Sequence, residues 1–414
     1  MKTEQEHNNE QCTMNNVQWR KVRFGEFFDM LPTNTLSRDK LNDQQGEYQN
    51  IHYGDVLIKY PFCLDCNNAE IPYINDGVKF NTAEVRDGDV IFADTAEDDT
   101  VGKCVEVLNV GDRKIVSGLH TYFCRPRHKM ALGYLGYYLN SNHFHNQLLP
   151  YIAGSKVSSV NRTSIARTFI SYPADLSAQR RIAAILASAD KVIAATQKTI
   201  AKYKQIKQGM MEDLLNEQCT MNNVQWKKVR LGEGCNRMCN GMTYDIDEKE
   251  GYLVTRIETI SDGYIDYNRV GHTKELPKED YKLLKGDILF SHINSVKHIG
   301  KVAYFDGEEL LYHGMNLLLL RANNEINSKF LYYLLSSETV RQRMRTLAKS
   351  AVNQASINTT ELQKFSFFIP DLVEQHRIAA ILSGIDAKIA AEEKVLQKYE
   401  KVKKGLMERL LNEQ

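Results

Sequence analysis

The chain has 414 residues, of which 43% are hydrophobic and 25% are charged, and its formal net charge is +1. This length predicts two or more domains with enough apolar material for packed cores. No apolar run reaches membrane-spanning length, and the polar N-terminus MKTEQEHNNEQ argues against a signal peptide. Eight cysteines without a framework spacing favour reduced thiols and a cytoplasmic protein. The near-zero charge does not indicate a nucleic-acid binder, although it can hide a basic face.

The stretch NEQCTMNNVQW occurs twice, at residues 9–19 and 216–226, without a single difference. Looser matches follow in the same order: 88–92 with 286–290, 102–105 with 300–303, and 179–194 with 374–390. We therefore expect two halves of about 200 residues, related by a pseudo-twofold axis. Structure alone does not require an identical linker, because the rest of each half has diverged. Exchange of bodies at the DNA level and a recent duplication of one linker both remain explanations.

Each half begins with a body of mixed secondary structure. Gly-Asp turns precede short predicted strands at 89–92 and 287–290. Further strands are predicted at 119–125, 315–321, 169–172 and 365–369, and short helices at 132–140 and 329–337. The last strand of each body stops at a proline, Pro173 or Pro370, and a helix follows.

A long helix is predicted after each body. Apolar residues recur at three- and four-residue steps from Ile182 to Leu214 and from Ile378 to Leu410, so the two helices can pair. Asp371 and Glu374 have the spacing of a capping box. The opposite faces carry Lys198, Lys202, Lys204, Lys207, Lys398, Lys401, Lys403 and Lys404. This charge pattern indicates a solvated face, and a DNA-facing role is the alternative.

The helix starts share the pattern L-x-x-Q-x-R-I-A-x-I-L-x-x-x-D. It runs from Leu176 to Asp190 and again from Leu372 to Asp386. The pattern W-x-x-V-x-[LF]-G-E also occurs twice, at Trp19 and Trp226. Together, over nearly the whole chain, these patterns resemble the specificity subunit of type I restriction–modification enzymes.

The resemblance implies an α+β fold with two similar target recognition domains, at 1–175 and 219–370. Two long antiparallel coiled-coil helices, at 176–218 and 371–414, would act as spacers in a pseudo-twofold internal repeat. Each domain would read one half of a bipartite site on double-stranded DNA. Two methyltransferase subunits using S-adenosylmethionine, and restriction (motor-nuclease) subunits using ATP and Mg, would dock on the chain. The chain itself would hold no cofactor or metal and would catalyse nothing.

The sequence offers little support for an enzyme. It has no Pro-Pro pair, which the catalytic motif of a DNA adenine methyltransferase needs, and Gly102-Lys103 and Gly300-Lys301 lack the Ser or Thr of a P-loop. These Gly-Lys pairs indicate turns at strand starts. Cys63 and Cys66 form a lone C-x-x-C without the second pair that zinc would want. A non-DNA coiled-coil scaffold, or a methyltransferase or nuclease with unrecognised motifs, remains the alternative.

Three polar stretches are the candidate DNA contacts, because hydroxyl, amide and basic side chains read base edges. They contribute Ser155, Lys156, Ser158, Ser159, Asn161 and Arg162; Ser291, His292, Asn294, Ser295, Lys297 and His298; and Lys349, Ser350, Asn353 and Gln354. The alternative is a set of solvated loops with local turn hydrogen bonds. The acidic loop 94–99 of the first body is expected to lie away from DNA phosphates.

Candidate partner contacts lie at the starts of the long helices. They are Gln179, Arg180, Arg181, Gln375, His376 and Arg377. The alternative is that these polar residues cap the helix start and form ion pairs there.

Overall fold

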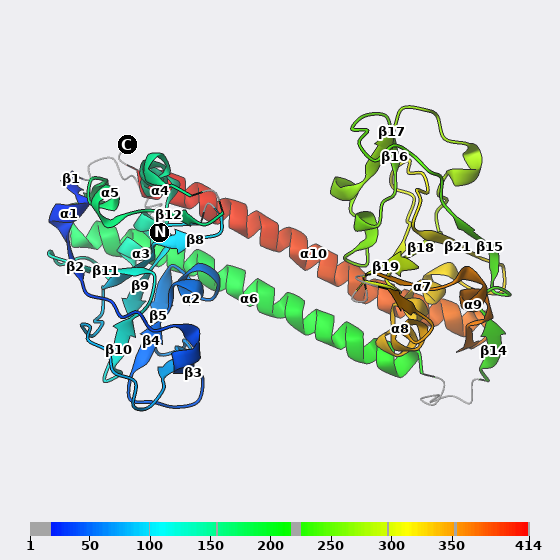
Figure 1. Cartoon of the computed structure of the whole chain (residues 1–414), viewed down its shortest axis with the longest axis horizontal. Coiled ribbons are helices and arrows are strands. Elements are labelled where there is room, and N and C mark those ends of the chain that lie inside the picture. The colour runs from blue at the N-terminus through cyan, green and yellow to red at the C-terminus, as the bar shows by residue number, and fades with distance from the viewer. Residues whose placement is uncertain are drawn as a thin grey trace, which may run out of the picture. The chain divides into compact units, whose positions relative to one another are not determined.

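A computed structural model describes residues 18–98, 100–154, 156–216, 225–295, 298–351 and 354–412. The repeated stretch NEQCTMNNVQW therefore lies mostly outside the described residues. The chain divides into two compact units, unit 1 (Met1–Gln197 and Val395–Gln414) and unit 2 (Lys198–Lys394) (Figure 1). Each unit contains one body and one half of each long helix. The domain boundaries predicted above follow a different division and stay a prediction.

A five-stranded sheet lies at the centre of the body in unit 1. Its order is β2 (Phe28–Leu31), β11 (Thr121–Pro126), β7 (Val90–Ala93), β9 (Cys104–Leu108) and β5 (Cys63–Asp65), antiparallel except for the parallel pair β5–β9. Val90 and Phe92 enter one apolar cluster, while Ile91 and Ala93 enter another on the opposite face. Because both faces of β7 are buried, its sequence is a continuous apolar run.

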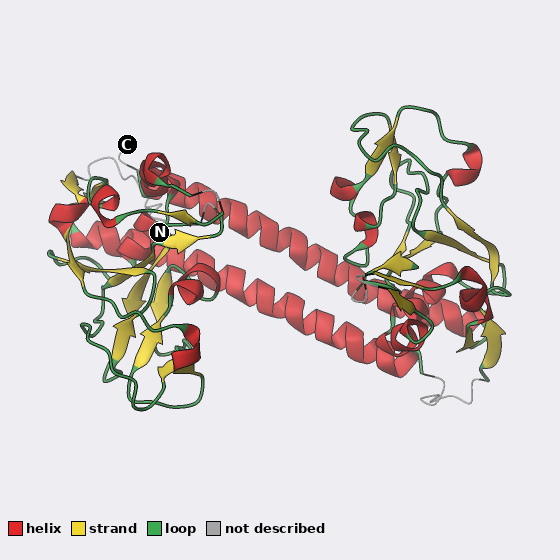
Figure 2. Ribbon diagram, viewed as in Figure 1, coloured by secondary structure: helices red, strands yellow, loops and turns green. Residues whose placement is uncertain are grey.

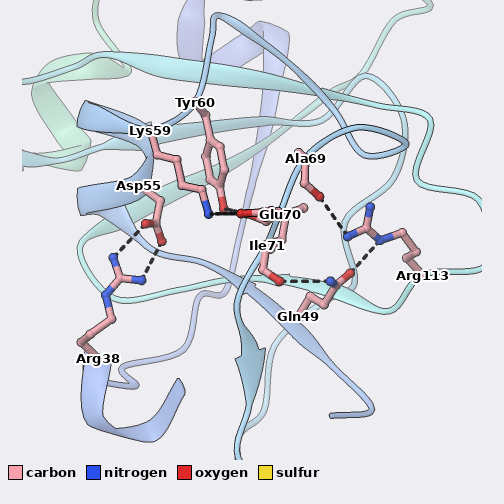
Figure 3. A network of polar contacts seen from close by, with 9 residues as sticks. All are labelled: Arg38, Gln49, Asp55, Lys59, Tyr60, Ala69, Glu70, Ile71 and Arg113. Carbon is pink, nitrogen blue, oxygen red and sulfur yellow. Dashed lines mark hydrogen bonds and ion pairs between the residues drawn. The ribbon is translucent and has the colours of Figure 1, made fainter. Parts of the chain in front are cut away.

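A second sheet of short strands completes this body. Its order is β10 (Ile115–Ser117), β4 (Gln49–Ile51), β6 (Tyr73–Ile74) and β3 (Leu41–Asn42). Figure 3 shows the polar contacts that hold the connecting loops. The guanidinium of Arg38, in the 3-10 helix η1 (Arg38–Lys40), donates two hydrogen bonds to Asp55 of α2 (Tyr53–Ile58), and Arg113 Nε donates to Gln49 Oε1 at 2.7 Å. Paired polar groups thus join these loops beside an apolar cluster that includes Val56, Tyr60 and Ile71.

The remaining elements of unit 1 lie around this core. They are β1 (Trp19–Arg23) paired with β13 (Phe169–Pro173), β8 (Thr95–Ala96) paired with β12 (Ser158–Ser159), α1 (Phe24–Phe27), α3 (Tyr134–Leu139), α4 (Asn142–Leu148), η2 (Leu149–Tyr151) and α5 (Arg162–Ile165). The strands predicted near 89–92, 119–125 and 169–172, and the helix predicted near 132–140, are confirmed with small shifts of their ends.

The body of unit 2 repeats this plan with different outer parts. Its central sheet has the order β15 (Cys235–Asn240), β21 (Leu318–Ala322), β18 (Ile288–Phe290) and β20 (Val302–Tyr304). The other elements are β14 (Lys227–Arg230) with β24 (Ser366–Ile369), β16 (Tyr252–Val254) with β17 (Gly271–Thr273), and β19 (Ile293–Asn294) with β23 (Gln354–Ser356) and β22 (Lys349–Ala351), then η3 (Glu258–Ile260), η4 (Tyr267–Arg269), η5 (Glu279–Tyr281), α7 (Ser328–Ser336), α8 (Glu338–Arg345) and α9 (Thr359–Lys364). The predicted strands and the short helix near 329–337 are confirmed here as well.

The two predicted long helices are present as α6 (Leu176–Leu214) and α10 (Leu372–Leu410), each 39 residues long (Figure 2). In unit 1, Leu186 of α6 and Leu410 of α10 enter the same core cluster. In unit 2, Leu382 of α10 is in the core, and Leu214 of α6 packs against it. Each body is thus covered by the start of its own helix and the end of the other. Among the described residues, no helix combines the length and apolar character needed to cross a bilayer.

Two expectations about the helices need correction. Asp371 caps α10 as predicted, since its Oδ1 accepts the Glu374 N–H at 2.9 Å, but the Glu374 carboxylate binds the Arg377 guanidinium instead of closing the capping box. The predicted solvated lysine face is wrong for Lys207 and Lys403. Their side chains are 24% and 18% exposed and form ion pairs within their units.

Candidate nucleic-acid interface

Both bodies share a set of polar contacts around the central strands. Asp89 is the aspartate of the Gly88-Asp89 turn, and its carboxylate accepts hydrogen bonds from Arg125 Nε at 2.8 Å and Nη2 at 2.7 Å. In unit 2, Asp287 accepts both bonds from Arg321 at 2.7 Å. Both aspartates are 1% exposed. A buried carboxylate needs such a bidentate partner, which explains why the Gly-Asp turn is repeated.

The Gly-Lys pairs are structural, as predicted. Gly102 and Gly300 have φ of 86° and 80°, the left-handed region that favours glycine. Lys103 Nζ donates to the Leu57 carbonyl at 2.7 Å, and Lys301 Nζ donates to the Ser261 carbonyl. Each ammonium therefore donates to a carbonyl at the C-terminal end of a short helix.

A small sheet projects from the same place in each core. In unit 1, β7 leads into β8, which pairs with β12 so that Ser158 faces Ala96 and Ser159 faces Thr95. In unit 2, β18 leads into β19, which pairs with β23, and β23 pairs with β22. The polar stretches 291–298 and 349–354, distant in sequence, thus meet in one three-stranded sheet. We call these two structures the small sheets.

The small sheet of unit 1 exposes only part of its predicted stretch. Lys156 and Ser159 are exposed and Ser158 is half-buried. Asn161 and Arg162 are also exposed, but both are bound within the unit: Asn161 Oδ1 accepts the Ser164 N–H at 2.8 Å and caps α5, and Arg162 Nη2 donates to the Met30 carbonyl at 2.7 Å. The candidate Ser155 lies outside the described residues.

Two residues that the sequence predicts as DNA contacts are buried next to the small sheet of unit 2. Ser291 and His292 are 0% and 5% exposed, so they belong to the core, and burial lowers the pKa of His292. Asn294 Nδ2 donates to Ser291 Oγ at 3.0 Å. Ser295 and Lys349 are exposed, and His298 is half-buried. Lys297 and Asn353, together with the side chains of Ser350 and Gln354, lie outside what the structure describes.

The acidic loop of unit 1 lies beside the candidate DNA contacts, and the expectation that it lies away from DNA phosphates stays a prediction. Its first residues form β8, the partner of β12, and Glu97 and Asp98 after them are exposed. The Thr100 N–H and hydroxyl donate to Asp98 and hold the pKa of that carboxyl below its usual value. Asp99 is outside the described residues. Carboxylates beside a reading surface disfavour phosphate and favour donors such as the cytosine amino group.

Two of the predicted partner contacts are buried and hold the body to its helix. Gln179 and Gln375 are each 1% exposed. The Gln179 side chain accepts the Ala131 N–H at 2.9 Å and donates to the Pro173 carbonyl at 2.7 Å. Gln375 accepts the Asn327 N–H at 2.8 Å and donates to the Pro370 carbonyl at 3.0 Å. Neither glutamine side chain is therefore accessible to a partner in this structure. The other four candidates are exposed: Arg180, Arg181, His376 and Arg377.

Nothing in the described part of the chain forms a metal centre, since no group of three or more His, Cys, Asp or Glu side chains gathers there. Cys63 and Cys66 are free thiols. Burial raises the pKa of both, to about 11 for Cys66, so they are protonated and unreactive at neutral pH.

Comparison with known proteins shows the family to which the chain is similar. A sequence profile described as "Type I restriction modification DNA specificity domain" matches residues 16–205 and 223–401. A putative type I restriction enzyme MjaX specificity subunit from Methanocaldococcus jannaschii is 46% identical over 191 residues, 45% of this chain and 45% of that protein. The MjaVIII specificity subunit of the same organism is 27% identical over 278 residues, 62% of this chain and 64% of that protein. The matched segments span less than two thirds of either relative.

Solved structures share the fold over nearly the whole chain. The type I restriction–modification S subunit from M. genitalium has a TM-score of 0.56 at 16% identity and covers 97% of this chain and 98% of its own. A chain from a study of complex assembly and conformational transition of the type I R-M system has a TM-score of 0.58 at 18% identity, with coverage of 96% and 99%. At these identities the likeness shows the fold alone.

Proposed function

Since the chain belongs to the family of type I restriction modification DNA specificity domains and carries two of them, we propose that it is a specificity subunit. Each body reads one half of a bipartite DNA sequence, and the long helices set the spacer between the halves. One observation carries this proposal. Both bodies contain the same core contacts, but the small sheets beside these contacts differ. The Asp–Arg pairs are the same in both units, whereas the exposed residues of the small sheets are not. Such a design separates a constant scaffold from variable readers.

The DNA contacts that this proposal assigns are the exposed residues of the small sheets. In unit 1 these are Lys156 and Ser159, with the half-buried Ser158 between them and Glu97 and Asp98 next to them. In unit 2 they are Ser295 and Lys349. The lysines suit phosphates, which position the protein, and the hydroxyls and carboxylates suit base edges, which specify the sequence.

The remaining parts of the proposal concern partners. Two methyltransferase subunits dock near Arg180, Arg181, His376 and Arg377, which are exposed beside the two buried glutamines. These partners bring S-adenosylmethionine, and restriction (motor-nuclease) subunits bring ATP and Mg. The chain works in the cytoplasm and contributes no catalytic group. A chain with a near-zero net charge leaves much of the DNA backbone for its partners to neutralise.

The test exchanges one body. Residues 20–172 are replaced by the corresponding body of a relative with another specificity, and the variant is expressed with its methyltransferase subunit. Sequencing of methylated DNA should show one half of the recognised sequence changed and the other half kept. The matched control replaces the body of unit 2, and it should change the other half only. If either exchange alters both halves, or if the wild-type complex methylates no bipartite sequence, the proposal is wrong.

A further inference from the structure

A carboxylate of each long helix binds two groups from different parts of its unit. In unit 1, Asp190 of α6 accepts the Tyr137 hydroxyl of α3 at 2.7 Å. Its other oxygen lies 2.5 Å from Lys403 Nζ of α10. The same ammonium lies 4.6 Å from the Phe62 ring centroid and 5.6 Å from that of Tyr137. Three segments of unit 1, its body and both helices, thus meet at one carboxylate.

Unit 2 contains the same arrangement at the equivalent positions of the repeat. Asp386 of α10 accepts the Tyr333 hydroxyl of α7 at 2.7 Å, and Lys207 Nζ of α6 lies 2.6 Å from its other oxygen. Lys207 Nζ is also 5.5 Å from the Tyr333 ring centroid. Ser383, within 3.2 Å of the Tyr333 hydroxyl, is an addition in this unit. We call Tyr137, Asp190 and Lys403, and likewise Tyr333, Asp386 and Lys207, the triads.

The lysine of each triad comes from the helix of the other repeat. Gln179 and Gln375 join a body only to the start of its own helix. Lys403, by contrast, joins the first body to the end of α10, and Lys207 joins the second body to the end of α6. Each triad is therefore a polar contact between a body and both helices at once.

The polar and apolar contacts at this junction do different work. The end of α10 also packs Leu406, Met407 and Leu410 against the core of unit 1, as does Leu411 directly after the helix. Apolar contacts are non-directional, so they tolerate rotation or sliding of a helix over a body. Hydrogen bonds to a carboxylate at 2.5–2.7 Å fix both distance and direction. The apolar contacts thus stabilise the packing of α10 on the body, while the triad fixes the position of α10 relative to the body.

We propose that the triads fix the angle at which each recognition body sits on its helix pair, and so determine how strictly the protein measures the spacer between the two half-sites. This inference rests on the proposed function. Lys403 and Lys207 are positioning residues, which contact neither the DNA nor a reacting atom. The ion pairs are partly exposed, with side chains of Lys403 and Asp190 at 18% and 30%. Solvent screening makes such pairs weak contributors to folding stability. Their main effect is therefore to fix the position of the body on its helix pair.

The experiment uses the full chain in complex with its methyltransferase subunit. The bipartite sequence that the wild-type complex methylates is first identified by sequencing. Synthetic duplexes then carry the same half-sites with the native spacer, one base pair less or one base pair more. The measured quantity is the ratio of methylation rates on native and altered spacers. Lys403→Met should lower this ratio by about three- to fivefold. Lys207→Met should act alike through unit 2, and the recognised bases should not change.

The controls separate positioning from a merely structural role. Lys404→Met removes the same charge from the adjacent exposed residue and should leave the ratio unchanged. The exchange Asp190→Lys with Lys403→Asp should restore much of the ratio that either single change loses. If Lys403→Met does not fold, Asp190→Asn carries the same expectation, because it keeps the shape of the side chain and an oxygen for Tyr137. Equal loss of rate on all three duplexes would overturn the inference. Absence of any bipartite methylation by the wild-type complex would instead refute the proposed function.

Discussion

The Glu106 carboxylate accepts a hydrogen bond from the Gly133 N–H at 2.8 Å at the start of α3, and its other oxygen accepts one from Gly136 at 2.8 Å. Glu106 is 0% exposed. Burial raises its pKa to about 7, although these N–H groups favour the charged form. A carboxyl that titrates near neutral pH thus holds the helix that carries Tyr137 of the first triad.

We predict a pH dependence of unfolding from Glu106. The folded pKa lies above the unfolded value of 4.5, so the folded state binds more protons between these values. Glu106 therefore contributes up to ~3 kcal/mol to the free energy of unfolding. This contribution is fully present below about pH 4.5 and is lost as the pH rises through about 7. Glu106→Gln does not titrate, so the difference in unfolding free energy between variant and wild type should shift in favour of the variant from pH 5 to pH 8. Urea unfolding at both pH values measures it.

The comparison of Glu106→Gln with wild type is needed because other buried groups also change the unfolding free energy between pH 5 and pH 8. Burial lowers the pKa of His313 to about 4, so its effect has the opposite sign: stability is lost as pH falls below about 6.5. His313 is present in both proteins and cancels. A pH-independent difference would mean that Glu106 is charged in the folded state.

Removing the partner of a buried aspartate should be costly. Arg125→Met leaves Asp89, 1% exposed, without its bidentate partner and should destabilise the protein by about 3 kcal/mol. Arg127→Met is the control, because its pair with Asp29 is exposed on both sides and should contribute no more than about 1 kcal/mol. The free energy of unfolding of both variants, measured by chemical denaturation, tests this prediction. Equal effects would contradict the role assigned to the Gly-Asp turn.

The signature glutamine and its neighbour should behave differently. Gln179→Ala leaves the Ala131 N–H and the Pro173 carbonyl without their partner, so we expect a loss of about 1–3 kcal/mol in unfolding free energy. Arg180→Ala, at an exposed position, should change it by no more than about 0.5 kcal/mol. If Arg180 contacts the methyltransferase, this variant should instead weaken assembly, measured by titration of the two purified subunits. Normal assembly would remove Arg180 from the docking surface.

Lengthening the helices should change the spacer only when both are lengthened. Four residues add ~6 Å to a helix, and DNA rises ~3.4 Å per base pair, so the spacer should grow by one or two base pairs. The insertion points are after Gln197 in α6 and after Lys394 in α10, where the compact units divide. An insertion in α6 alone should destabilise the protein, because Leu214 of α6 and Leu410 of α10 pack into the cores of different units, and an unmatched insertion would strain these apolar contacts. Sequencing of the methylated DNA measures the spacer, and an unchanged spacer from an active double insertion would show that the helices do not set it.

The sequence by itself determined the features that depend on local pattern and on repetition. The apolar steps from Ile182 to Leu214 specify a helix because each residue meets its neighbours three and four positions away. The Gly-Asp and Gly-Lys turns are equally local, since only the chain next to Gly88 or Gly102 needs the left-handed conformation. Two copies of such local signals, in one order, were enough to predict the repeat and its family.

The tertiary structure alone decided which polar residues face water. Gln179 and Arg180 are adjacent and equally polar in sequence, yet one is 1% exposed and the other is exposed. Ser291 and His292 looked like loop residues but continue a buried strand. The sequence predicts a solvated face for Lys403, because its partners Asp190 and Phe62 lie far away in the chain. Periodicity describes one element at a time, whereas burial and pairing of a polar side chain depend on the element that packs against it.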